Sequence, residues 1–183
     1  MARLPYLNQE DLAEDDRRLL ERPANLFRQL VHQPDGFRSY SRLGLWIRNQ
    51  NDLDPRLREL AIIQIGYMTD CAYEYTHHIK LGLEQFGLSE DDVRAVAIES
   101  RGDASGLGDV ERAVLRLTRQ VTDTLAPTDA AFEEVREQLG DATLVALLMA
   151  VSFYAMTVRL LFSLQVDLEP EYAHYLEEFP LGG

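Results

Sequence analysis

The chain has 183 residues, of which 46% are hydrophobic and 27% charged, and it contains a single cysteine, Cys71. This length and apolar content fit one compact, folded domain and exclude a wholly disordered chain. One cysteine excludes an internal disulfide, a cysteine-rich zinc site and hydroperoxide chemistry by an intramolecular cysteine pair. The net charge of −13 argues against nucleic acid as a partner, since proteins that bind it normally carry a basic face.

Two segments bear on where the protein resides. The N-terminal residues Met1–Tyr6 lack the apolar core of a signal peptide, so we expect a cytoplasmic protein. The uncharged stretch 142–158 is interrupted at Arg159, short of the ~20 apolar residues that a spanning helix needs. We therefore expect no membrane partner, and we predict that this stretch is a helix buried in the core or at a subunit interface.

Taken in chain order, the hydrophobic residues recur at helical spacings almost throughout, and no segment alternates with a period of two. The sequence therefore predicts an all-α fold, a single-domain helical bundle over residues 1–183. The predicted helices are a charged surface helix over 10–21, followed by helices over 25–31, 37–47, 55–68, 71–86, 93–98, 110–121, 128–140 and 141–166. An acidic, aromatic tail begins at Glu169.

Local signals mark where several of these helices begin and end. Asp54 followed by Pro55 is a start signal, since the aspartate side chain caps a helix and proline suits its first turn. Gly87 and Gly140 are expected to end helices. The glycine-rich segment 101–108 is the clearest loop in the chain.

The window from Glu59 to His78 holds the candidate catalytic residues. Cys71, Glu74 and His78 are spaced i, i+3 and i+7, which places them on one stripe of one helix. Glu59 sits within an apolar run of the preceding helix, where burial would raise the pKa of a carboxyl group. Two carboxyl groups facing an imidazole can have the pKa values that proton transfer needs. An ordinary surface pair of Glu74 and His78, with Glu59 reaching water, would explain the same spacing without any chemistry.

The pattern Glu59-x11-Cys71-x2-Glu74-x3-His78 resembles that of the carboxymuconolactone decarboxylase and alkylhydroperoxidase-D-like superfamily. The likeness extends upstream to the segment 26–34 and downstream through the last long helix, so it covers about residues 25–166. The charged N-terminal helix and the acidic C-terminal tail flank this core. The resemblance implies an all-helical fold with no cofactor and no metal, which assembles as a homo-oligomer, often a trimer or a hexamer.

The resemblance also separates two chemistries by the residue that precedes the histidine. The peroxidase branch carries Cys-x-x-Cys, and its second cysteine attacks the peroxide. Here Glu74 occupies that second position, and Cys71 matches only the partner cysteine. The decarboxylase-like branch has a glutamate there, as this chain does. The resemblance therefore implies a carboxymuconolactone decarboxylase-like enzyme acting on a small organic acid or lactone, whose catalytic residues are Glu59, Cys71, Glu74 and His78.

That reaction gives each residue an expected role. His78 or Glu74 would protonate the carbon that carbon dioxide leaves, and Glu59 would orient the imidazole or share its proton. Because both carboxyl groups are negative when ionised, an anionic substrate would need a nearby cation such as Arg58 or Arg159.

Three alternatives stay open. A thiol-dependent, peroxiredoxin-like hydroperoxidase would use Cys71 with an external thiol. A di-iron carboxylate protein would use the two Glu-x-x-His pairs at 74–77 and 171–174, although the second lies in the charged tail. A non-catalytic helical oligomer would have kept the fold and lost the reaction.

Overall fold

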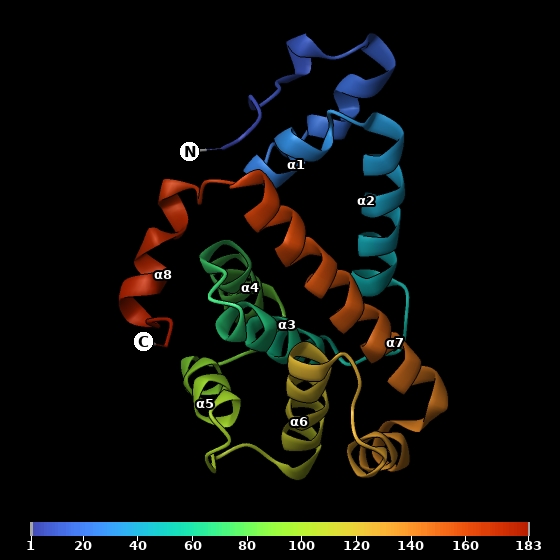
Figure 1. Ribbon diagram of the computed structural model, residues 1–183, viewed down its shortest axis with the longest axis vertical. Helices are drawn as coiled ribbons and strands as arrows, with labels where there is room; N and C mark the ends of the chain where they lie inside the picture. The colour runs from blue at the N-terminus through green and yellow to red at the C-terminus, as the bar shows by residue number, and fades with distance from the viewer. Residues whose placement is uncertain (1, 183) are drawn as a thin grey trace.

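The computed structural model describes residues 2–182, and Met1 and Gly183 lie outside it. Within that range the chain forms eight α-helices, three short 3-10 helices and no strand (Figure 1), which confirms the predicted all-α fold. The α-helices are α1 (Asn25–Leu30), α2 (Pro34–Asn49), α3 (Pro55–Met68), α4 (Ala72–Gln85), α5 (Glu90–Ser100), α6 (Asp109–Thr124), α7 (Asp129–Leu164) and α8 (Ala173–Glu178). The 3-10 helices are η1 (Gln9–Asp11), η2 (Glu14–Leu20) and η3 (Pro170–Tyr172).

The helix α3 forms the centre of the fold. Its residues 60–63 and 65 are 0% exposed, and it packs against α4, α5, α6 and α7. In Figure 1, α3 and α4 lie side by side in the middle of the molecule, and α7 runs diagonally past them. Such surroundings suit a helix that is apolar nearly all round, because each Å² of apolar surface removed from water contributes ~25 cal/mol.

Gly66 sets how closely α3 and α4 approach each other. A Cβ atom at this position would lie 2.7 Å from the backbone nitrogen of Tyr75 and 2.8 Å from its Cα. The backbone nitrogen of Cys71 also donates a hydrogen bond to the Gly66 carbonyl at 2.9 Å, across the turn between the two helices. Any side chain at residue 66 would collide with backbone, so only glycine permits this helix spacing.

The two helices predicted over 128–140 and 141–166 form one element, α7, with a kink inside it. Gly140 has a φ of 78° and a ψ of 165°, so the predicted break is present as a bend that glycine accommodates. By length and composition alone α7 could cross a membrane, yet 56% of its 18-residue apolar window is buried inside the protein. Burial of this kind is expected of a core helix.

Both terminal segments differ from what their sequences predict. The expected surface helix over 10–21 consists of η1 and η2 instead. Its only buried residue is Leu20, which packs with Val31 and Phe37 in a small cluster, so an α-helix there would have too little apolar face to be stabilised. The acidic tail, for which the sequence predicts no helix, forms η3 and α8 because Tyr175 and Phe179 are buried in the main core.

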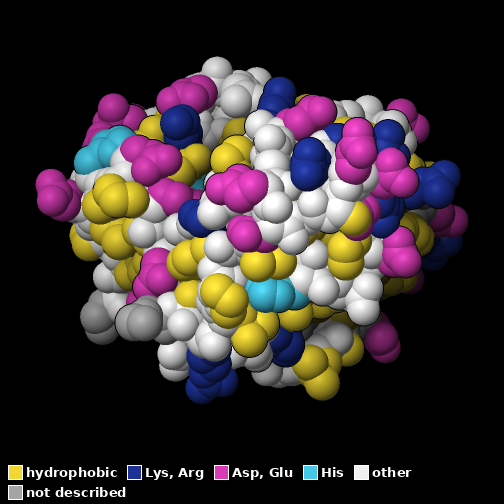
Figure 2. All heavy atoms as spheres, turned by 90° about the horizontal axis from the view of Figure 1, so that it is seen from above, with side chains coloured by type: hydrophobic (Ala, Val, Ile, Leu, Met, Phe, Trp, Pro, Cys, Tyr) yellow, Lys and Arg dark blue, Asp and Glu magenta, His cyan; other side chains and the backbone are white. Residues whose placement is uncertain are grey.

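Charges of both signs are intermixed on the surface. Figure 2 shows acidic, basic and hydrophobic side chains side by side on one face, where the basic ones are scattered rather than gathered in a patch. Several arginines pair with nearby carboxylates, as Arg38 does with Asp35 (2.7 Å) and Arg94 with Glu90 (3.1 Å). This arrangement fits the prediction that nucleic acid is not a partner, which stays a prediction.

Candidate functional site

Helices α3 and α4 place Glu59 and His78 face to face. The helix α3 begins where the sequence predicts, since the Asp54 side chain accepts hydrogen bonds from the backbone nitrogens of Arg56 (2.7 Å) and Leu57 (3.2 Å). Glu59 follows about one turn later and is 1% exposed, so it does not reach water. His78 lies on the facing side of α4 and is 6% exposed. The carboxylate and the imidazole are both shielded from solvent.

The side chains form a continuous chain of polar contacts. His78 Nδ1 lies 2.6 Å from Glu59 Oε2, and His78 Nε2 lies 3.0 Å from Glu74 Oε1. The other oxygen of Glu59 accepts a hydrogen bond from Arg58 Nε at 3.0 Å. The ring of Tyr154 packs edge-on against the imidazole, with 4.7 Å between centroids. Both ring nitrogens of His78 thus face carboxyl oxygens, which is the environment that suits a doubly protonated imidazolium.

These contacts shift two pKa values in opposite directions. Burial alone would lower the pKa of His78, but the charge of Glu59 and the hydrogen bonds to Glu59 and Glu74 outweigh it and raise the pKa to about 9. Burial alone would raise the pKa of Glu59, but the charge of His78 and the contacts with His78 and Arg58 hold that pKa below its usual value. At neutral pH the pair is therefore an imidazolium and a carboxylate.

His78 and Glu74 line a cavity of about 630 Å³, a volume that suits a small organic molecule. Glu59 does not line it and lies on the other side of the imidazole, against Nδ1. The walls come from η2, α1, the segment between them, α2, α4 and α7. Most of them are apolar or aromatic, and they include Leu26, Phe27, Phe37, Tyr40, Gly44, Leu45, Tyr73, Leu81, Phe153 and Tyr154.

Three further polar residues line the cavity that are not among the predicted catalytic residues. The Arg48 Nε is buried and has no hydrogen-bond partner. The Tyr40 hydroxyl lies 2.9 Å from Thr157 Oγ1, whereas the Tyr154 hydroxyl forms no hydrogen bond within residues 2–182. Burial raises the pKa of Tyr154, so its phenol stays protonated. Because α2 and α7 contribute these residues, no spacing within the chain connects them to the window 59–78.

Cys71 lies outside this cavity. It is the N-cap of α4, and its φ of −92° and ψ of 88° are not helical, so the stripe that joins Glu74 and His78 does not extend to it. The residue lines a second cavity of about 410 Å³ together with Phe162 and Leu168. Burial raises the pKa of the Cys71 thiol to about 12. A thiol so far from ionisation is a poor nucleophile at neutral pH.

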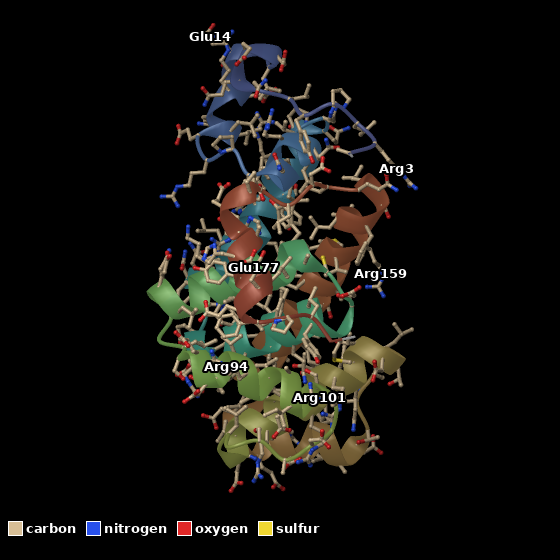
Figure 3. The ribbon with its side chains drawn as sticks, turned by 90° about the vertical axis from the view of Figure 1, so that its left-hand side faces the viewer. Arg3, Glu14, Arg94, Arg101, Arg159 and Glu177 are labelled. Atoms are coloured by element: carbon tan, nitrogen blue, oxygen red, sulfur yellow. The ribbon has the colours of Figure 1, made fainter. Side chains whose placement is uncertain are left out.

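The two cations considered from the sequence lie in different places. Arg58 is 1% exposed and donates hydrogen bonds to Glu59 (3.0 Å) and to the Arg48 carbonyl (2.8 Å). Arg159 is exposed, does not line the cavity, and donates to the Ala155 carbonyl at 2.6 Å. Figure 3 shows Arg159 at the outer edge of the molecule, away from α3 and α4. Of the two, only Arg58 belongs to the site.

The residues considered for a di-iron site have other surroundings. The His77 ring is stacked between those of Tyr73 and Tyr172, with centroid distances of 4.1 Å and 3.7 Å. Glu171 and His174 are both exposed. Across the described part of the chain, no three His, Cys, Asp or Glu side chains are grouped so that they could hold a metal ion. His77 instead joins α4 to the C-terminal segment.

The sequence model of the carboxymuconolactone decarboxylase family matches residues 34–120, a segment that contains Glu59, Glu74 and His78. No curated protein matches the chain.

Several solved structures of low sequence identity share the fold. The alkylhydroperoxidase AhpD core of an uncharacterized peroxidase-related protein from Ralstonia eutropha JMP134 is 20% identical, with a TM-score of 0.81 over 99% of this chain and 98% of its own. An uncharacterized peroxidase-related protein from Silicibacter sp. TM1040 is 17% identical, with a TM-score of 0.72 over 93% of this chain and 92% of its own. A cysteine-to-alanine variant of the debrominase Bmp8, in complex with 2,3,4-tribromopyrrole, is 14% identical, with a TM-score of 0.81 over 98% of this chain and 100% of its own.

At these identities the solved structures show a common fold and no more. The family match covers the segment that contains Glu59 of α3 and His78 of α4, the hydrogen-bonded pair that we call the dyad. Residues 34–120 thus match the carboxymuconolactone decarboxylase family in sequence, and the chain shares its fold with alkylhydroperoxidase-D-like proteins.

Proposed function

We propose that the protein is a cofactor-independent enzyme that removes a carboxyl group from a small organic acid or lactone by proton transfer. The observation that carries this proposal is the buried imidazolium of His78, held between Glu59 and Glu74 at the wall of a mostly apolar cavity. A general acid must lie within hydrogen-bond reach of the substrate and hold its proton at the working pH. His78 meets both conditions, since it lines the cavity and its pKa is raised to about 9.

The proposed step uses a substrate whose carboxylate is attached to a carbon next to a conjugated carbonyl group. The bond from this carbon to the carboxylate breaks, carbon dioxide leaves, and the electron pair stays on the carbon and spreads into the carbonyl group. The proton held between His78 Nε2 and Glu74 Oε1 then forms the new C–H bond, and solvent returns a proton to the imidazole. Glu59 keeps its charge and holds Nδ1, so it acts as a positioning residue.

The surroundings of Cys71 favour this chemistry over a thiol mechanism. The thiol lines a different cavity from His78, and its raised pKa keeps it protonated at neutral pH. A peroxidase needs a thiolate that peroxide can reach. We therefore assign the catalytic role to Glu74 and His78, with Glu59 in support, and none to Cys71.

Release of carbon dioxide from carboxymuconolactone tests the proposal. Replacing His78 with glutamine should lower kcat roughly 100-fold or more, because the general acid is lost, while Cys71→Ser should leave the rate unchanged. The control for fold is the far-ultraviolet circular dichroism of each variant. Thiol-dependent consumption of hydrogen peroxide that disappears in Cys71→Ser, without any release of carbon dioxide, would replace the decarboxylase proposal with the peroxidase.

We also propose that the protein is soluble and self-associates through α7. Its residues Val145, Met149 and Met156 are 54%, 39% and 42% exposed and share one side of the helix. Exposed apolar stripes of this kind mark protein interfaces. Met149→Asp should shift the mass measured by light scattering toward the monomer. The matched control Leu125→Asp, which alters an apolar residue 80% exposed outside α7, should not. A wild-type mass equal to one chain would contradict the proposal.

A further inference from the structure

We infer that Arg48 is the anion-binding residue of the cavity, and that it selects a ligand with a flat apolar ring and a carboxylate. The binding of an anion by Arg48 does not depend on the proposed function, and only the choice of the carboxylate that Arg48 holds rests on that function. The binding site itself follows from the surroundings of Arg48.

The guanidinium of Arg48 faces the cavity without a protein partner. Its Nε is buried and donates no hydrogen bond, and no carboxylate within residues 2–182 forms an ion pair with the guanidinium. An unpaired buried cation nitrogen is costly unless something satisfies it. The main chain of Arg48 is fixed meanwhile, since its carbonyl accepts a hydrogen bond from Arg58 at 2.8 Å. The side chain is thus placed at the cavity wall with a donor to spare.

The charges around the cavity leave Arg48 unneutralised. Counted as carboxylates, Glu59 and Glu74 balance the imidazolium of His78 and the guanidinium of Arg58, to which they are joined. Arg48 is outside this balanced group and adds a positive charge. The other charged residues that line the cavity, Arg18, Glu21 and Arg22, are exposed and together add one more positive charge. A −13 protein can therefore still hold an anion in this cavity.

The other walls specify what the anion is attached to. Phe27, Phe37 and Phe153 line the cavity, and flat rings pack well against aromatic faces. The Tyr154 hydroxyl is a second donor without a protein partner, and its raised pKa keeps the proton on it. A ring that bears a carboxylate would use all three features at once: the aromatic walls, the guanidinium and the phenol.

The carboxylate at Arg48 is one that the reaction does not consume. Carbon dioxide is neutral, so a cation next to the departing carboxylate would stabilise the substrate more than the transition state and slow the reaction. Arg48 serves decarboxylation only if it holds a group that keeps its charge. Arg48 then determines how the substrate is oriented and which substrates bind, and His78 and Glu74 remain free to act on the reacting carbon.

Equilibrium binding of benzoate and of its uncharged isostere benzamide tests this inference without requiring turnover. By calorimetry, the wild-type protein should bind benzoate at least about tenfold more tightly than benzamide, the scale of one charge-assisted hydrogen bond. Arg48→Gln should remove this preference and leave benzamide binding unchanged, and Arg48→Lys should retain part of it. The matched control is Arg42→Gln, which alters an exposed arginine of the same helix outside the cavity and should change neither ligand.

Equal binding of the two ligands by the wild type, or a benzoate preference that survives in folded Arg48→Gln, would overturn the inference. Its failure is distinguishable from failure of the proposed function. Loss of the preference in Arg48→Gln, in a protein that releases no carbon dioxide, would keep the anion site and discard the decarboxylase. Release of carbon dioxide by a wild-type protein that shows no preference for benzoate would keep the decarboxylase and discard the anion site.

Discussion

Replacing Glu59 with glutamine is expected to lower the pKa of His78 from about 9 to its ordinary value of 6.5 or below. The charge of Glu59 is the largest influence that raises this pKa, and burial, which lowers it, would remain. The glutamine oxygen can still accept a hydrogen bond from Nδ1, so the variant removes a charge and preserves the contact. The pKa can be measured from the NMR shifts of the His78 ring protons as a function of pH, with His78→Gln identifying the signal.

The matched control is Glu74→Gln, which changes the same ring at its other nitrogen. Its effect on the pKa of His78 should be smaller, because Glu74 contributes less than Glu59 does. The rate of decarboxylation should follow the protonated fraction, so the alkaline limb of the wild-type pH profile should fall near pH 9 and move to lower pH in Glu59→Gln. A His78 pKa that stays near 9 after loss of Glu59 would contradict the electrostatic account of the dyad.

The free energy of unfolding should fall as the pH rises from about 6.5 to about 9, by about 3 kcal/mol. In this range folded His78 holds a proton that the unfolded chain has released, so raising the pH favours unfolding. The stabilisation is fully present below the unfolded pKa of 6.5 and is lost as the pH passes the folded value of about 9. The free energy of unfolding can be measured by urea denaturation at intervals from pH 6 to pH 9.5, with circular dichroism as the signal.

Two variants separate His78 from other titrating groups. His78→Gln should be less stable at every pH, because Glu59 loses a partner while buried, and its stability should no longer decline between pH 6.5 and 9. Cys71 also has a raised pKa, from 9.0 to about 12, and its contribution is lost only above its unfolded value. Cys71→Ser should therefore keep the decline below pH 9. A decline that persists in His78→Gln would assign it to another residue.

The sequence predicts those parts of the site that share one helix or two consecutive helices. Glu74 and His78 are one turn apart on α4, and Glu59 lies on the preceding helix, so helical spacing brings them within reach of one another. Cys71 has the right spacing for the same stripe, but it lies one residue before the helix begins and its backbone turns away. Periodicity cannot identify that boundary to a single residue.

Arg48 and Tyr154 are beyond the reach of periodicity for a different reason. They come from α2 and α7, far from the window 59–78 in the chain, and only tertiary packing brings them to the cavity. The same limit applies to the ends of the protein. Leu20 and Tyr175 show in the sequence as apolar residues among charges, and only the packed structure shows that both are buried.

The backbone contact at Gly66 has a consequence for how this protein could change over evolution or by design. Because α3 and α4 touch there through backbone rather than through side chains, the 2.6 Å contact between Glu59 and His78 is tied to helix spacing. The raised pKa of His78 therefore depends on the spacing between α3 and α4. The other residues that line the cavity come largely from α2, α7 and the N-terminal segment. They can be replaced without changing the pKa of His78.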